Sequence, residues 1–391
     1  MPERIDRITD LARQLAPTMV ELRRAIHAHP ETGWREHATT ARVAAALRRA
    51  GLEPAIRPGG VGATVDAGIE GPKVGFRCDL DALPIDEHTT TTYRSTVPGV
   101  MHACGHDVHT AVAVGIAAVL HRIDDLAGKV RVIFQPAEEQ IPGGATVLRT
   151  EAVHEGLSAL IAFHVDPSLA PGSIGARVGA ITSASDRMSI TLHGPGGHTS
   201  RPHQTVDLVN VAGKVITELP QMVRADIDPR SPFVVVFGRI SGGSAENVIP
   251  TEIELGGTVR VFDAALWREL PKTVEDVIAA IVNPLGAEFE LDYVQGSPPV
   301  VNDPVVAEIF AKAARSAIGT HRVEHTHQSL GSEDLAWFLQ DVTGAMFRLG
   351  AAPAYRTVDL HSSTFDVDES CIETGIVVGA AAVAALLDHY A

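Results

Sequence analysis

The spacing of apolar residues predicts an α/β layer sandwich for much of the chain. Apolar residues recur at helical spacing over residues 5–28, and a second helix is predicted over residues 38–50. Short, continuously apolar segments then alternate with helical ones: strands at 73–78, 129–135 and 160–163, and a helix at 110–120. Strands buried on both faces have continuous apolar runs of this kind, so we expect a central mixed sheet covered by helices.

The pattern changes near residue 180, where apolar and polar residues begin to alternate. The alternation predicts strands at 187–192, 233–240, 252–262 and 288–294, with helices at about 205–219 and 265–281. This β-α-β-β-α-β order is that of a ferredoxin-like unit. We therefore expect an α+β lid domain over residues 180–295. It would interrupt a catalytic α/β domain made of residues 1–179 and 296–391.

Composition narrows the classes of protein that the chain can belong to. Its 391 residues exceed one ordinary core, so two domains are expected. The formal net charge of −16 argues against nucleic acid and against an anionic membrane surface. Three cysteines and an N-terminus without an apolar signal core favour a cytoplasmic location. The longest apolar run, 375–387, is too short for a membrane span and predicts a buried helix.

The densest group of metal-ligand side chains lies at residues 101–110, Met-His-Ala-Cys-Gly-His-Asp-Val-His-Thr. Cys104 and His106 are two residues apart, and Gly105 between them lets the backbone bend, so both side chains can reach one metal. The alternative is a polar turn with Asp107 or Thr110 as the N-cap of the next helix.

Paired carboxylates follow the predicted strand 129–135. Glu138 and Glu139 come directly after Pro136, at the carboxyl end of that strand, which is where open α/β sheets place their sites. Because Pro136 favours a departure from the strand, both carboxylates can serve one site, one on a metal and one on water. Two solvated acids in a loop are the alternative.

The remaining candidates are single residues, each of which also fits an ordinary structural role. His164 follows the strand 160–163, and His361 lies in a loop near the C-terminus. Asp79 and Asp81 follow the strand 73–78 and are suited to orienting a ligating histidine. Together with Glu139, the residues Cys104, His106, His164 and His361 make five ligands, which suits two metals better than one.

Three polar residues of the predicted lid are further candidates. His198 lies in the glycine-rich segment 194–200, which is otherwise a tight turn with Thr199 or Ser200 as an N-cap. Asn247 and Arg260 belong to the same unit. Arg260 is suited to a bidentate pair with a substrate carboxylate, or to a surface salt bridge.

These motifs resemble the metallopeptidase-related amidohydrolases, in the branch of hippurate hydrolase, N-acyl-amino-acid amidohydrolase and indoleacetyl-amino-acid hydrolase. The resemblance runs nearly end to end and rests on segments 27–31, 79–84, 101–107, 135–139, 196–198, 247–250, 331–334 and 360–362. Many relatives have Pro where this chain has Ser363, and Phe where it has Leu335. Neither position is a ligand, so the departures bear on substrate identity.

The resemblance implies a catalytic domain split by a lid through which two chains form a homodimer. It implies two divalent metal ions, with Zn, Mn, Co or Ni as candidates, held by Cys104, His106, Glu139, His164 and His361. It also implies Glu138 as general base. His198 would reach a substrate oxygen, often in the partner subunit's site, with Asn247 and Arg260 assisting.

We therefore predict a hydrolase that cleaves the amide bond of small N-acyl amino acids or similar substrates. Water shared by two metals would lose its proton to Glu138, and His198 would stabilise the oxyanion. A dipeptidase or carboxypeptidase on the same scaffold is the first alternative. A metal-binding protein without catalysis is the second, but Glu138 would then have no purpose. No nucleic acid or membrane partner is expected.

Overall fold

The structure is a computed structural model that describes residues 2–225, 227–354 and 358–391. Two compact units make up the chain. The first, here the catalytic unit, comprises Met1–Gly179, Val301–His327 and Asp334–Ala391. The second, here the inserted unit, comprises Ala180–Val300 and Gln328–Glu333.

The units differ from the predicted domains at two places. The inserted unit continues to Val300 instead of ending at residue 295, and it includes residues 328–333. Backbone hydrogen bonds from Ile181 to Val300 and from Ser183 to Ser329 tie these segments to its first residues. Such pairings join positions more than 100 residues apart, so local patterns do not reveal them.

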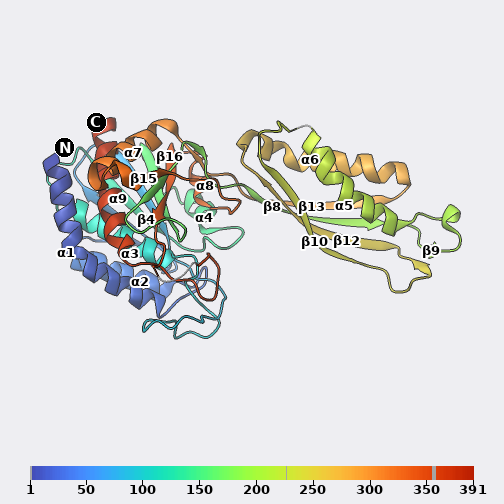
Figure 1. The fold of residues 1–391 in the computed structure, drawn as a ribbon, viewed down its shortest axis with the longest axis horizontal. Coiled ribbons are helices and arrows are strands. Elements are labelled where there is room, and N and C mark those ends of the chain that lie inside the picture. The colour runs from blue at the N-terminus through green and yellow to red at the C-terminus, as the bar shows by residue number, and fades with distance from the viewer. Residues whose placement is uncertain (1, 226, 355–357) are drawn as a thin grey trace. The chain divides into compact units, whose positions relative to one another are not determined.

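A mixed eight-stranded sheet forms the centre of the catalytic unit (Figure 1). Its order is β1-β2-β4-β3-β5-β16-β6-β15. The four central strands β4, β3, β5 and β16 are parallel, while β1, β2 and β6 join by antiparallel pairings. The bounds are β1 Ala55–Ile56, β2 Ala63–Gly68, β3 Lys73–Asp79, β4 Lys129–Gln135, β5 Ala159–Asp166, β6 Ile174–Ala176, β15 Val323–His325 and β16 Gly344–Gly350.

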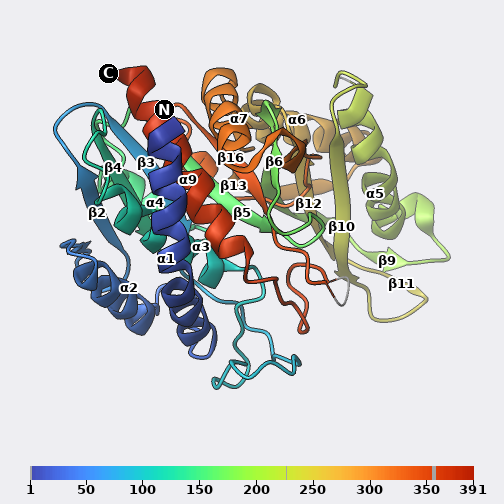
Figure 2. The ribbon, with the colours of Figure 1, turned by 60° about the vertical axis from the view of Figure 1, so that its left-hand side comes forward.

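Apolar helices cover this sheet. Figure 2 shows α1, α3 and α9 side by side, and α3 and α9 also contact β3. The helix bounds are α1 Pro2–His27, α2 His37–Arg49, α3 His106–Leu120, α4 Gly144–Thr150, α7 Pro304–Ile318, α8 Leu335–Phe338 and α9 Cys371–Tyr390, with a 3-10 turn η3 at Thr320–Arg322. Every residue of α3 is buried, because this helix lies between the sheet and other helices.

Helix α9 is long and apolar enough to span a membrane by length and composition alone, with a mean hydropathy of 1.8. It is longer than the predicted buried segment 375–387. In the structure 78 % of its most apolar window is buried, and it contacts α1, α3 and α7. The helix therefore belongs to the core of the catalytic unit.

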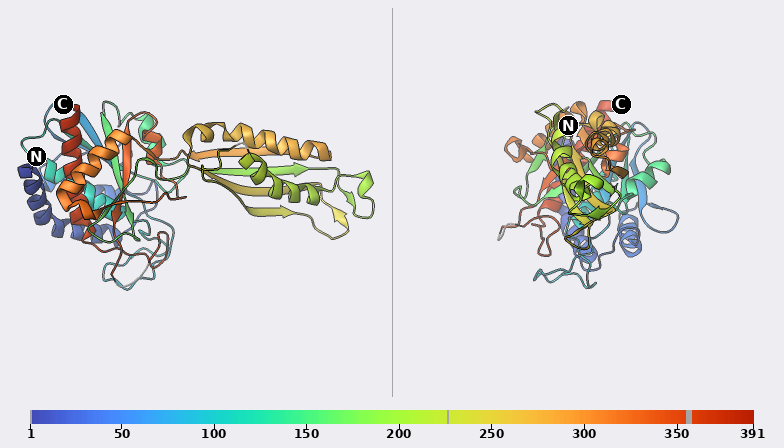
Figure 3. Two further views of the ribbon diagram at one scale, coloured as in Figure 1. Left: turned by 45° about the horizontal axis from the view of Figure 1, so that its top comes forward. Right: turned by 90° about the vertical axis from the view of Figure 1, so that its right-hand side faces the viewer.

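The inserted unit has the predicted β-α-β-β-α-β order (Figure 3). Its antiparallel sheet has the order β10-β12-β8-β13, and α5 and α6 pack together on it. The bounds are β8 Ser185–His193, β9 Gly197–His198, α5 Leu208–Ala225, β10 Phe233–Gly242, β11 Val248–Ile249, β12 Glu252–Val261, α6 Ala264–Val282 and β13 Glu288–Ser297, with 3-10 turns η1 at Pro202–Gln204 and η2 at Asn283–Leu285. The short strands β7 (Gly179–Ala180) and β14 (Val301–Asn302) pair with each other.

Two alternative interpretations of the sequence are wrong. The N-cap of α3 is Gly105, with φ 84°, and not Asp107 or Thr110. A Cβ atom at this position would lie 2.4 Å from Val165 Cγ2, so both the backbone angle and the space require glycine. Helix α5 begins at Leu208, too far along the chain for Thr199 or Ser200 to cap it.

Candidate metal centre

Three parallel strands bring the predicted site residues of the catalytic unit to one edge. Asp79 ends β3 opposite Gln135 at the end of β4, and His164 lies near the end of β5. Strand β3 lies between β4 and β5, so the two long strands that follow it in the chain lie on opposite sides of it. Sites in open α/β sheets usually lie at such a reversal of strand order. The strand order therefore explains why residues far apart in sequence share one edge.

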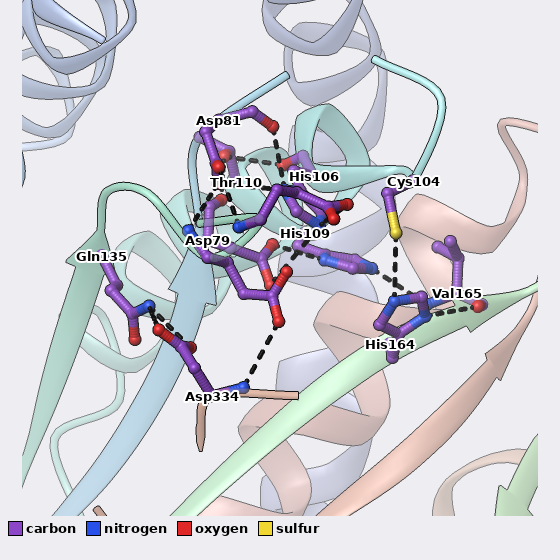
Figure 4. A network of polar contacts seen from close by, with 12 residues as sticks. Asp79, Asp81, Cys104, His106, His109, Thr110, Gln135, His164, Val165 and Asp334 are labelled. Carbon is purple, nitrogen blue, oxygen red and sulfur yellow. Dashed lines mark hydrogen bonds and ion pairs between the residues drawn. The ribbon is translucent and has the colours of Figure 1, made fainter. Parts of the chain in front are cut away.

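All five predicted ligands converge at this edge. Figure 4 shows Cys104, His106 and His164 among them. The Cys104 Sγ atom lies 3.4 Å from His164 Nε2 and 3.4 Å from His361 Nε2. His361 Nε2 is in turn 3.2 Å from Glu139 Oε1, which is 3.9 Å from His106 Nε2. The donor atoms form two trios that share Cys104: one adds His106 and His164, the other Glu139 and His361.

In His106 and His164, hydrogen bonds at Nδ1 leave Nε2 available to bind a cation. His106 Nδ1 lies 2.8 Å from the Asp81 carbonyl oxygen, and His164 Nδ1 lies 2.8 Å from the Val165 carbonyl oxygen. A carbonyl only accepts, so each Nδ1 carries the proton and each Nε2 keeps its lone pair. Among the described residues, His106 Nε2 is buried without a hydrogen-bond partner.

The pKa shifts show that this group of side chains attracts positive charge. Burial and the nearby Glu139 raise the pKa of the Cys104 thiol. Hydrogen bonds to Cys104 and Glu139 raise the pKa of His361 to about 10. A cation would take the place of these protons, because it stabilises both anions at once. Thiolate, imidazole and carboxylate donors together fit a divalent transition metal.

Asp79 differs from its predicted role of orienting a ligand. Its carboxylate accepts from His109 Nδ1 at 2.6 Å and from Arg77 at 2.8 Å, while His106 Nε2 is 3.9 Å away. His109 Nε2 accepts the Val165 backbone N–H at 2.9 Å. Asp79 is therefore linked through His109 to the backbone of β5 next to His164. The sequence did not predict this link.

Asp81 contacts both halves of the site. Its carboxylate accepts the backbone N–H groups of Glu138 at 3.0 Å and Glu139 at 3.1 Å, and one of its oxygens is 3.3 Å from His106 Nδ1. A single buried carboxylate thus joins a ligand on α3 to the turn that carries the paired glutamates. The orienting role of Asp81 stays a prediction.

Glu138 borders the donor atoms. One of its carboxylate oxygens lies within 4.8 Å of donor atoms of both His106 and Glu139. Glu138 Oε1 accepts the Asp334 backbone N–H at 3.3 Å. The Asp334 carboxylate is bound by Arg77 at 2.6 Å and by the Gln135 amide at 2.8 Å (Figure 4). These contacts join β3, β4 and the start of α8 beside Glu138.

The three residues predicted in the lid lie in the inserted unit. His198 is exposed on β9, and its Nδ1 accepts the Ser200 backbone N–H at 3.1 Å. Asn247 is also exposed, and its carbonyl accepts the Thr199 N–H next to His198. Arg260 donates to the Leu330 carbonyl at 2.7 Å, and within the described ranges of the chain it has no carboxylate partner.

Sequence reasoning did not assign roles to several residues that hold the site together. They are Glu36, Arg77, His109, Gln135 and Asp334, all buried. His109 and Gln135 lie inside motifs that were recognised, so their positions were a signal. Arg77 and Glu36 had none, because a charged residue in a strand or loop is usually exposed.

A family model described as peptidase family M20/M25/M40 matches residues 75–385 of this chain. These residues include all five converging ligands and Glu138. The chain belongs to this family. The protein is a metal-dependent amide hydrolase, as the motifs predicted.

Relatives in this family carry several names. A protein of Synechocystis named as a hydrolase is 40 % identical over 95 % of this chain and 96 % of its own length. An N-acyl-L-amino acid amidohydrolase of Geobacillus stearothermophilus is 38 % identical over 77 % of this chain and 81 % of its own. A Rhodococcus jostii protein named as a glutamate–cysteine ligase is 41 % identical over 92 % of this chain, but this chain spans only 45 % of that protein.

Solved structures show the same fold. An aminohydrolase-named protein of methicillin-resistant Staphylococcus aureus has a TM-score of 0.90 and 30 % identity, and the match covers 99 % of this chain and 100 % of that one. A Bacillus subtilis protein described as a dinuclear metal binding peptidase of the M20 family has a TM-score of 0.85 and 31 % identity, covering 96 % and 99 %. The α/β fold with an inserted α+β unit is therefore that of the family.

Proposed function

We propose that this protein releases the acyl group from N-acyl amino acids, with two divalent cations held by Cys104, His106, Glu139, His164 and His361. The observation that carries the proposal is the pair of donor trios that share Cys104 beside a further carboxylate, Glu138. One catalytic metal needs about three protein ligands, so five ligands favour two cations. The dinuclear relative in Bacillus subtilis supports this number.

The substrate class rests on the relatives. The Geobacillus stearothermophilus relative carries an N-acyl-L-amino acid amidohydrolase name. A relative named thermostable carboxypeptidase 1, from Saccharolobus solfataricus, is 34 % identical over 96 % of this chain and 97 % of its own length. We therefore keep a carboxypeptidase as the second candidate. In either case the guanidinium of Arg260, which has no carboxylate partner within the described part of the chain, is suited to the free carboxylate of the substrate.

In the proposed mechanism, bound cations supply Lewis acidity that lowers the pKa of water and polarises the amide carbonyl. Glu138 accepts the proton of the attacking water and later gives it to the leaving amine. The Asp334 N–H, together with the Asp81 carboxylate that accepts the Glu138 N–H, orients the Glu138 carboxylate. In the inserted unit, His198 accepts from Ser200 at Nδ1, so a neutral ring offers the Nε2 proton to a substrate oxygen.

We also propose that two chains associate through the inserted unit in the cytoplasm. Strand β10 is an edge of its sheet and exposes Val236 and Ile240, while the neighbouring helix α5 exposes Val209 and Met222. An unpaired edge with an adjacent apolar helix suits a second copy of the same unit. Light scattering should give twice the chain mass, and an Ile240→Glu substitution should give the monomer mass.

Adjacent variants test the site. Glu138→Gln should keep both cations and lower kcat about 10²–10⁴-fold, the usual contribution of a general base. Glu139→Gln should lower the metal content itself. Metal analysis and hydrolysis of N-acyl amino acids and dipeptides, after chelation and with Zn, Mn, Co or Ni added back, give both readouts. A Glu138→Gln variant with normal turnover would remove Glu138 from this role, and a preference for dipeptides would favour the second candidate.

A further inference from the structure

The turn that carries the two glutamates contains a strained residue. Ala137, directly before Glu138, has φ 53°, in the left-handed region that is strained for a non-glycine residue. The residue is fully buried, and its carbonyl accepts the Gly144 N–H at 2.8 Å. Because this bend separates β4 from Glu138 and Glu139, its conformation sets the direction of both side chains.

Two buried carboxyl groups accept the three successive backbone N–H groups of this turn. Glu36 Oε1 accepts from Ala137 at 2.7 Å, while the two Asp81 oxygens accept from Glu138 and Glu139. Glu36 and Asp81 come from different segments, before α2 and after β3. The turn is therefore fixed by elements outside its own strand.

Glu36 is free for this contact because another residue performs its expected task. It occupies the N-cap position of α2 but makes no side-chain capping bond. Glu31 accepts the N–H groups of Ala38 at 3.0 Å and Thr39 at 2.8 Å instead. The helix start is satisfied without Glu36, whose side chain reaches the turn after β4.

The burial of the Glu36 carboxyl group lowers the stability of the fold, which argues against a purely structural role. Its side chain is 0 % exposed, and among the described residues Oε2 has no hydrogen-bond partner. Burial and the neighbouring Asp81 raise its pKa to about 7, although backbone hydrogen bonds, that of Ala137 among them, lower it. A buried carboxyl group with an unpaired oxygen costs stability, and such local costs concentrate at functional sites.

We infer that Glu36 is a positioning residue of the active site: it holds Ala137 in the left-handed conformation and so directs Glu138 and Glu139. The inference rests on the proposed roles of those two glutamates. Either protonation form of the Glu36 carboxyl can accept the Ala137 N–H, so the contact depends on the acceptor oxygen. Glutamine keeps that oxygen, whereas alanine removes it.

The experiment compares Glu36→Ala, Glu36→Gln and the double variant Glu36→Ala/Ala137→Gly. Glu36→Ala should lower kcat about 10–100-fold at saturating metal, as expected for displaced catalytic groups. Glu36→Gln should stay within about threefold of the unaltered protein. Glycine adopts positive φ without strain, so Ala137→Gly should restore part of the kcat lost in Glu36→Ala. Glu31→Gln, which affects only the cap of α2, is the matched control and should leave kcat unchanged.

A second readout does not need turnover. In the metal-free protein, hydrogen exchange at the amides of residues 137–139 should be faster in Glu36→Ala and unchanged in Glu36→Gln. Normal kcat and normal exchange in Glu36→Ala would overturn the inference, as would a loss of kcat that Ala137→Gly does not relieve. Full turnover in Glu138→Gln would instead contradict the proposed function, so the two failures are distinguishable.

Discussion

The turn carrying Glu138 and the segment carrying His198 are held in very different ways. Around Glu138, the buried carboxyl groups of Glu36 and Asp81 accept backbone N–H groups of the turn, and the Asp334 backbone N–H donates to the Glu138 carboxylate. The Gln135 amide in turn donates to the Asp334 carboxylate. His198 is exposed, and its hydrogen bonds and strand pairing come from nearby residues of the inserted unit. The comparison indicates that the proposed general base is positioned by buried groups of the catalytic unit, while the proposed oxyanion donor lies on an exposed segment.

A second group of buried charged side chains in the catalytic unit surrounds Arg23. Arg23, on α1, is fully buried and contacts Asp107 at 2.6 Å, directly after the ligand His106. Glu369 and His27 complete this group, at 3.1 Å and 3.3 Å from Arg23. The core behind the metal centre is therefore ionic, and removing one member leaves the others uncompensated.

The largest expected effect comes from breaking this group. Arg23→Met should lower the free energy of unfolding by about 3–5 kcal/mol, because Asp107 and Glu369 lose a buried cation. The adjacent Arg24→Met is the matched control. Arg24 pairs with Glu369 near the surface, and its loss should change the free energy by less than about 1 kcal/mol. Urea unfolding of both variants measures the difference. Equal losses would mean that burial does not distinguish the two arginines.

An intermediate effect is expected at the exposed segment, and it should appear in catalysis alone. His198→Ala should lower kcat about 10²–10³-fold, because the oxyanion would lose the proposed donor. Its free energy of unfolding should change by no more than about 0.5 kcal/mol, as for other surface substitutions. His203→Ala, at a second exposed histidine of the same unit, should leave both quantities unchanged. A large loss of stability in His198→Ala would break the comparison between the two regions.

The smallest effect concerns the pH dependence of stability. His27 is buried, which lowers its pKa, but Asp107 and Glu87 outweigh that effect and raise it above its usual value. Protonated His27 thus stabilises the fold at low pH, and this contribution disappears as pH rises through the raised pKa. The difference in unfolding free energy between the unaltered protein and His27→Gln should narrow as pH rises above the usual histidine pKa of 6.5 and through the raised pKa. A constant difference would contradict the ionic role of His27. His29→Gln controls for the loss of a histidine from the same segment.

Much of the fold was readable because each element repeats its own pattern. The strands at 73–78 and 129–135 differ from β3 and β4 by no more than one residue, since continuous apolar runs are unambiguous there. The helix predicted at 110–120 actually begins at His106, because polar ligands occupy its first turn. The segment 328–333 was assigned to the wrong unit, since its partners lie near residues 181–183.

The side chains that converge at the candidate site were predictable, but the residues that support them were not. Cys104, His106 and Glu139 are chemically distinctive residues in recognisable motifs. Glu36, Arg77 and Asp334 act through tertiary contacts that span up to 257 residues. No local pattern distinguishes a carboxylate that binds a distant backbone N–H from one that faces solvent.

The amino-acid sequence alone determined which side chains carry the chemistry and which secondary structures carry them, because both follow from residue type and local spacing. Only the tertiary structure decided how those side chains are oriented. Orientation depends on buried hydrogen bonds, such as Glu36 to Ala137 and Asp81 to the two glutamates, that join segments brought together by the strand order of the sheet.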